Sequence, residues 1–161
     1  MHFLRTMAIV AVAGVTAIWK ASPGRRGEAP MDISRDNERP AAPGAAETFT
    51  GDVSVKPLFS PNAVRNIGSA EVSFTPCART AWHTHPGGQT LVVTQGSGWV
   101  QQWGGPKQRI GPGDVISTPP DVKHWHGATD TTAMTHIAIQ ATVDGRPVDW
   151  LEHVTDDQYL H

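Results

Sequence analysis

Cysteine is almost absent from this chain, because Cys77 is the only one among 161 residues. A lone cysteine excludes an internal disulfide framework and a cysteine-rich zinc module, so any metal must be bound by histidine, amide or carboxylate side chains. We expect Cys77 itself to act as a small buried apolar residue. An excess of positive charge is also missing. The formal net charge of −2 argues against a nucleic-acid partner.

Long apolar runs are scarce as well. The run at residues 7–19 is too short for a stable membrane span. It fits the apolar part of a signal peptide, which would make the protein periplasmic or secreted, although no clear cleavage site follows. Alternatively, translation starts at Met31 and the protein is cytoplasmic. Residues 21–46 have the composition of a linker or flexible arm under either interpretation. We therefore place an N-terminal segment at 1–46 and a single domain at 47–161.

Glycine and proline are plentiful, with 16 and 13 residues, and they separate short alternating segments. This pattern predicts an all-β protein of short strands and tight turns, either a sandwich or a small barrel. Gly96 and Gly98 predict a hairpin between two of the strands. Thr155 is placed to cap a short C-terminal helix. The expected strands span residues 48–59, 69–75, 90–95, 99–103, 115–118 and 132–141.

Histidine is concentrated in one part of the domain, at His83, His85, His124, His126 and His136. The first four form two pairs, each with one residue between its members. On a β-strand, residues two apart point to the same face, roughly 6–7 Å from each other, so both rings of a pair can reach one ion. Neutral imidazole is the commonest protein ligand for transition metals. The two pairs therefore predict a metal site built on strands.

Gln89 completes the expected set of ligands. It follows His85 across a Pro-Gly-Gly turn that lets the chain fold back, and His124 comes from a separate strand. We expect His83, His85, Gln89 and His124 to bind the ion and to leave coordination positions open. Because these four ligands are neutral, the whole charge of a divalent ion stays available to act on a bound hydroxyl group or water.

The histidine segments resemble the sequence motifs of the cupin superfamily. The first motif appears here as His83-x-His85-x3-Gln89-x6-Gly96, with glutamine where most cupins have glutamate. Cys77 occupies the place of the usual first glycine. The resemblance implies a double-stranded β-helix, or jelly-roll barrel, with a metal at its mouth.

The second cupin motif appears as Pro119-x-Asp121-x2-His124, and Ala128 stands where most cupins have asparagine. The resemblance assigns the fourth ligand position to His124 and not to His126. The substitution at Ala128 departs from the usual motif but leaves His124 in the position of the ligand histidine.

Four segments carry a narrower resemblance, to the bacterial cupin hydroxynitrile lyases and the small single-domain cupins around them. They read RTAWHTHPGGQTLVVT, KHWHGA, TTAMTHIAIQ and VDWLEHVTDDQY. The resemblance implies a metal-dependent lyase that cleaves or forms cyanohydrins and therefore acts on a small molecule. It implies manganese above all, or iron, and a site of nitrogen and oxygen ligands also accepts nickel, cobalt or zinc. It also implies a homo-oligomer, either a dimer or a tetramer.

Two further histidines are candidate catalytic groups in this interpretation. Either His126 or His136 would remove the proton of the substrate hydroxyl group, since histidine titrates near neutral pH. Gln140 would orient His136 or the nitrile. The apolar wall of the substrate pocket is expected from Ala70, Val72 and Phe74.

Other functions remain open at this point. A different cupin metalloenzyme, such as a dioxygenase or an isomerase, would use the same ligands. A non-catalytic cupin that binds a small molecule is a further alternative. We expect the tryptophans at 82, 99, 103, 125 and 150 to serve packing and not catalysis.

Overall fold

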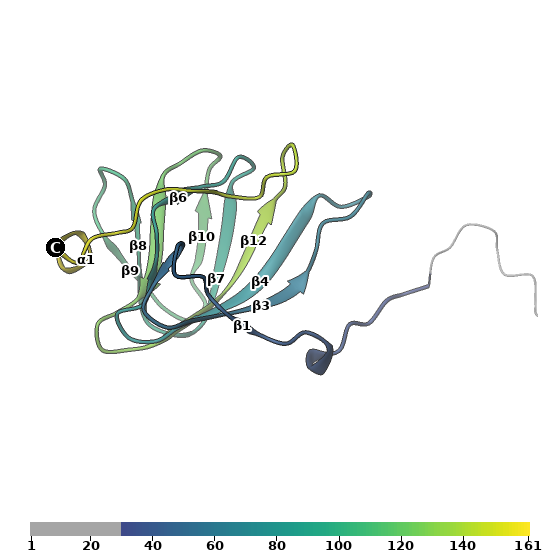
Figure 1. Ribbon diagram of the computed structural model, residues 1–161, viewed down its shortest axis with the longest axis horizontal. Helices are drawn as coiled ribbons and strands as arrows, with labels where there is room; N and C mark the ends of the chain where they lie inside the picture. The colour runs from purple at the N-terminus through teal and green to yellow at the C-terminus, as the bar shows by residue number, and fades with distance from the viewer. Residues whose placement is uncertain (1–29) are drawn as a thin grey trace, which may run out of the picture. The chain divides into compact units, whose positions relative to one another are not determined.

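Short antiparallel strands make up most of the structure, a computed structural model that describes residues 30–161. The apolar run at 7–19 lies outside the described residues. Residues 34–161 form one unit in which two sheets face each other (Figure 1). The predicted all-β jelly roll is confirmed. No helix among the described residues is long and apolar enough to cross a membrane.

The first sheet has six strands in the order β1-β3-β4-β12-β7-β10. Its first strand, β1, lies inside the segment 1–46 that we assigned to a linker, and it pairs with β3. The strands are β1 (Ala42–Pro43), β3 (Val53–Phe59), β4 (Ile67–Phe74), β7 (Gln89–Gly96), β10 (Val115–Thr118) and β12 (Met134–Ala141).

The second sheet has seven strands, and β11 lies at its centre. On one side β11 pairs with the short strands β5 and β6, and on the other with β8. The strands are β2 (Phe49–Thr50), β5 (Arg79–Thr80), β6 (His83–Thr84), β8 (Gly98–Gln102), β9 (Gln108–Ile110), β11 (His124–Ala128) and β13 (Asp149–Trp150). A 3₁₀ turn, η1 (Asp36–Glu38), and a C-terminal helix, α1 (Asp156–Leu160), complete the described elements.

The core lies between the sheets, where alternate residues of each strand point inward. In β12, which agrees with the strand expected at 132–141, the side chains of Met134, His136 and Ala138 are buried. An apolar cluster fills the end of the sandwich below the histidines. It contains Val53, Val72, Phe74, Ala78, Val93, Ile110, Ala128 and Met134.

The predicted hairpin at Gly96-Ser97-Gly98 is wrong, because β7 and β8 belong to different sheets. The segment carries the chain from one sheet to the other, and the true hairpin joins β8 to β9. Gly96 has a positive φ of 75°, and both glycines also allow close packing. A Cβ atom at Gly96 would lie 1.8 Å from the carbonyl oxygen of Ala133, and one at Gly98 would lie 2.2 Å from the Met134 sulfur.

The C-terminal helix covers the outer side of the second sheet. Thr155 caps the helix, as predicted, by accepting a hydrogen bond from the backbone N–H of Gln158. Val154 and Tyr159 pack on Trp82 and Trp125, which are fully buried. These two tryptophans therefore serve packing on the side of the sheet that faces away from the histidines. Cys77, expected to be buried, is instead exposed in the turn before β5, with a backbone φ of 69°.

Candidate active site

Three of the predicted metal ligands meet between the two sheets. His83 lies on β6 directly opposite His124 on β11, because these two residues are partners in the strand register. His85 follows β6 in the chain and Gln89 begins β7. One ring nitrogen from each of His83, His85 and His124 lies within 4.8 Å of the other two. This three-histidine cluster could hold a metal ion.

Backbone carbonyl groups fix the orientation of all three rings. The Nδ1 atom of His83 lies 2.9 Å from the Ala81 oxygen, and that of His124 lies 2.9 Å from the Val122 oxygen. The third carbonyl comes from the distant C-terminal segment, where the Pro147 oxygen lies 2.6 Å from Nδ1 of His85. Each Nδ1–H therefore donates to a carbonyl, and each Nε2 keeps a free lone pair. This is the tautomer that a metal-binding histidine requires.

Gln89 provides a direct test of whether these residues fit a cation. Its Oε1 atom lies 3.0 Å from Nε2 of His124. With Nδ1 protonated, Nε2 of His124 is an acceptor, so two acceptors face each other without a proton between them. A cation satisfies both atoms at once. The Nε2 atom of His85 is likewise buried without a hydrogen-bond partner. The donor set therefore fits a divalent metal ion that prefers nitrogen and oxygen ligands.

Burial keeps the cluster neutral. Desolvation lowers the pKa of His124 to about 4, and it lowers the pKa of His83 well below its ordinary value of 6.5. The pKa of His85 is lowered for the same reason. At neutral pH the three imidazoles therefore carry no proton that an incoming cation would have to displace.

His126 and His136 form a second pair beside the cluster. His126 lies on β11 two residues after His124, and its Nδ1 atom is 3.1 Å from Nε2 of His136 on β12. Burial lowers the pKa of His126 well below 6.5 and that of His136 to about 4. The outer nitrogens of this pair, Nε2 of His126 and Nδ1 of His136, have no hydrogen-bond partner. Two neutral rings thus share one hydrogen bond and offer two unpartnered nitrogens.

His83 and His85 of the cluster border one cavity of about 130 Å³ together with His126 and His136, whereas His124 is not among its lining residues. Gln140 also lines it, with a buried amide oxygen that has no partner. Of the three predicted wall residues, Ala70 and Val72 line the cavity. The remaining lining residues are Phe49, Val55, Thr80, Gln89, Ala138, Val148 and Trp150.

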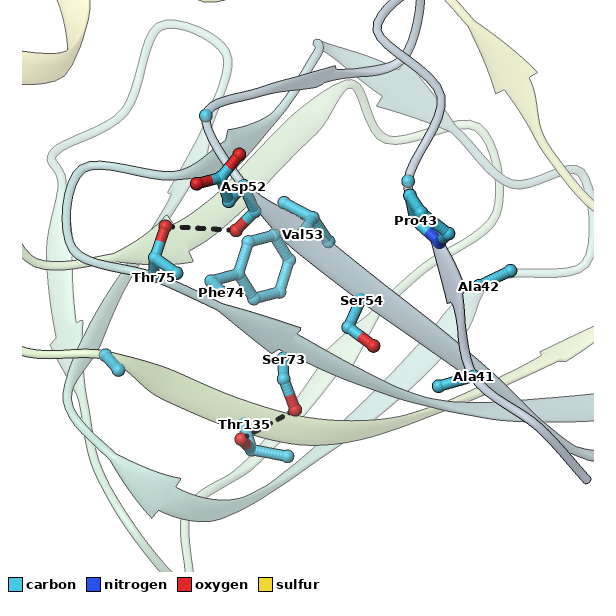
Figure 2. Close-up of a pocket in the computed structure, with 13 residues that line it drawn as sticks. Ala41, Ala42, Pro43, Asp52, Val53, Ser54, Ser73, Phe74, Thr75 and Thr135 are labelled. Carbon is cyan, nitrogen blue, oxygen red and sulfur yellow. Dashed lines mark hydrogen bonds between the residues drawn. The ribbon is translucent and has the colours of Figure 1, made fainter.

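Phe74 does not line this cavity, although the sequence placed it there. Its ring packs against the pair of His126 and His136, with centroids 5.9 Å and 5.5 Å from theirs. It borders instead a larger hollow of about 580 Å³ between β1, β3, β4 and β12 (Figure 2). That hollow has small and hydroxyl side chains, such as Ser73 and Thr135, and contains no histidine. Its chemistry does not support a catalytic site, so the smaller cavity is the candidate.

Sequence reasoning missed several residues of the cavity. Phe49, on β2, and Val148 and Trp150, near the C-terminus, lie far from the histidine motifs in the chain. No local pattern indicates that these segments reach the cavity. Thr80 was the residue that could have been found, because it precedes His83 on the same interrupted strand. Its Oγ1 atom accepts a hydrogen bond from the backbone N–H of His126 at 3.2 Å.

Two facing sheets with a histidine cluster between them define a cupin-type protein. Comparison with known proteins agrees, since a cupin domain model matches residues 70–140. The chain is also 54% identical over 129 residues to a protein named (R)-mandelonitrile lyase from Granulicella tundricola. This match covers 80% of the chain and 98% of its relative. The chain therefore belongs to the cupin family.

Solved structures give the same result for the fold. A cupin-like protein from Thermotoga maritima is 43% identical, with a TM-score of 0.71 over 80% of this chain and 95% of its own. The polyketide cyclase RemF from Streptomyces resistomycificus has a TM-score of 0.60 over 81% of this chain and 91% of its own. It is only 20% identical, so this second likeness concerns the fold alone.

Proposed function

We propose that this protein is a metal-dependent lyase that cleaves cyanohydrins into hydrogen cyanide and an aldehyde or ketone, and that catalyses the reverse addition. The observation that carries the proposal is the arrangement of the histidines around one cavity. His83 and His85 of the three-histidine cluster face the same small space as a pair of neutral histidines with unpartnered nitrogens. The high identity to a protein named (R)-mandelonitrile lyase supports this reaction among those that cupins catalyse.

His83, His85, His124 and Gln89 are the residues that would hold the ion, and manganese is our first choice among the divalent metals. A bound divalent ion supplies Lewis acidity to a hydroxyl group beside it. The protein supplies neutral ligands, which do not reduce the charge of the ion. It also supplies the carbonyl groups of Ala81, Pro147 and Val122, which hold the three rings in the binding tautomer.

The proton transfer is assigned to the pair of His126 and His136. One of their unpartnered nitrogens accepts the proton of the substrate hydroxyl group, and the oxygen then forms a double bond to carbon. The bond between this carbon and the nitrile carbon breaks, and cyanide leaves with the bonding electrons. Return of the proton gives hydrogen cyanide and restores the neutral pair. The amide of Gln140 lies beside this space and is placed to orient the nitrile or His136.

The test is whether the purified, manganese-loaded protein cleaves mandelonitrile, which is measured by the release of benzaldehyde. We expect the His136→Ala variant to keep its metal content and to lose at least about 100-fold in kcat, the usual range for removal of a general base. Wild-type rates in that variant would remove His136 from the mechanism. Absence of cleavage by the wild-type protein, together with oxygen uptake on a catechol or diketone, would favour an oxygenase instead.

A further inference from the structure

One wall of the histidine cavity comes from the end of the chain. After β12 the chain runs back along β6 toward α1 (Figure 1). Within this segment, residues 147–150 form what we call the C-terminal strap. Its Pro147 carbonyl orients His85, and Val148 and Trp150 line the cavity. An ion pair between Arg146 and Asp149, at 3.0 Å, adds support at the surface.

Trp150 occupies a special place in this strap. It pairs with His83 in the strand register, and the centroids of the two rings are 4.8 Å apart. Its indole also meets the ring of Phe49, edge to face, with centroids 5.7 Å apart. The side chain is 39% exposed although it lines the cavity. The indole therefore separates the space beside the three-histidine cluster from solvent.

The other apolar residues that line the cavity are held more firmly than Trp150. Ala70, Val72 and Ala138 lie on β4 and β12, which are central strands paired on both sides. By contrast, Trp150 belongs to a strand of two residues that pairs only with β6. A change at Trp150 can enlarge the cavity toward solvent without opening the core between the sheets.

The size of the cavity limits what it can accept. A volume of roughly 150 Å³ accommodates one benzene ring in a protein interior. The cavity here has about 130 Å³, so it has room for a substituent no larger than one six-membered ring. A fused pair of rings would have to extend into the space that the Trp150 indole fills.

We propose that Trp150 determines substrate size and restricts the enzyme to cyanohydrins whose carbon substituent is at most a single six-membered ring. This inference rests on the proposed lyase function. Phe49, which also lines the cavity, packs edge to face against the indole, and Val148 completes the wall.

The experiment compares two substrates in metal-loaded wild type and variants. They are mandelonitrile, with one ring, and the cyanohydrin of 2-naphthaldehyde, with two. We expect Trp150→Ala to raise the ratio of kcat/KM for the two-ring substrate to that for mandelonitrile by about tenfold or more. Trp150→Phe, which keeps a ring against His83, should give an intermediate ratio. Trp103→Ala is the matched control, because Trp103 is an exposed tryptophan outside the cavity, and it should leave the ratio unchanged.

Metal content is measured for each variant, since Trp150 also contacts a proposed ligand. An unchanged ratio in Trp150 variants that keep their metal would overturn the inference, and so would loss of metal in both Trp150→Ala and Trp150→Phe. If the wild-type protein cleaves no cyanohydrin, the proposed function fails. The size limit is then judged by calorimetric binding of benzaldehyde and 2-naphthaldehyde. It stands if wild type prefers benzaldehyde and Trp150→Ala removes that preference, and it fails if both proteins bind the two aldehydes alike.

Discussion

Acid should destabilise this protein through His136, and the effect can be isolated. The His136 side chain is fully buried, and desolvation lowers its pKa from 6.5 to about 4. In the unfolded chain the same imidazole takes up a proton as the pH falls below about 6.5. In the folded protein it stays neutral until the pH approaches 4. The unfolded state therefore binds more protons throughout this interval, and stability falls as the pH is lowered through it.

The magnitude follows from the two pKa values. At pH 5 the unfolded imidazole is almost fully protonated, whereas the buried one is almost fully neutral. The resulting loss of folding free energy from His136 alone is about 2 kcal/mol between pH 7 and pH 5. His124 and the other buried histidines add losses of the same sign, because burial also lowers their pKa values.

Comparison of variants separates His136 from the rest. Urea unfolding is followed at pH 7 and pH 5 with a chelator present, for wild type and for His136→Asn. The variant should lose about 2 kcal/mol less than wild type between the two pH values. His153→Asn changes an exposed histidine outside the cavity and is expected to follow wild type. An identical loss in wild type and His136→Asn would refute the assignment of acid sensitivity to this buried ring.

Three further outcomes are expected. His124→Ala should bind little metal, measured by elemental analysis, because it removes one of the three nitrogens of the cluster. Full occupancy would contradict the ligand assignment. Gln89→Glu should keep the metal but put a negatively charged ligand beside it, so the rising part of the pH–rate profile should move to higher pH. An unmoved profile would count against the argument from neutral ligands. Tyr159→Phe removes a hydroxyl group that donates a hydrogen bond to the Ala128 carbonyl at 2.9 Å, so it should lower the free energy of unfolding by about 1–2 kcal/mol. Unchanged urea unfolding would show that this hydrogen bond adds nothing to stability.

The sequence allowed the elements to be predicted wherever one face of a strand is buried. The strand expected at 132–141 agrees with β12, where the buried residues Met134, His136 and Ala138 alternate with less buried ones. The hairpin at Gly96 failed because glycine has two uses. It permits tight turns, and it also permits a positive φ and the close approach of two backbones, as at Gly96 here. Sequence alone does not distinguish these uses, since the second depends on residues that are distant in the chain.

The candidate site, like the fold, was predictable from the sequence only in part. The spacing of two residues places the histidines of each pair on one face of a strand, and the structure brings His83, His85 and His124 together. Their roles as ligands stay a prediction, as do those of the catalytic pair. What the spacing could not indicate was the far wall of the cavity. Phe49 and Trp150 reach it only because β2 and β13 join the second sheet beside the short strands β5 and β6.

Burial of His126 and His136 explains why the proposed reaction would need a cation. A histidine whose pKa is about 4 is a weak base, and protonating it creates an imidazolium ion in a desolvated cavity. A hydroxyl group is a much weaker acid than such an imidazolium, so the transfer is strongly uphill unless positive charge lies beside the hydroxyl oxygen. Three neutral imidazoles and a neutral amide would hold a divalent ion there without reducing its charge. The same burial also favours return of the proton from the imidazolium to cyanide. The low pKa of the base therefore disfavours the first proton transfer and favours the last.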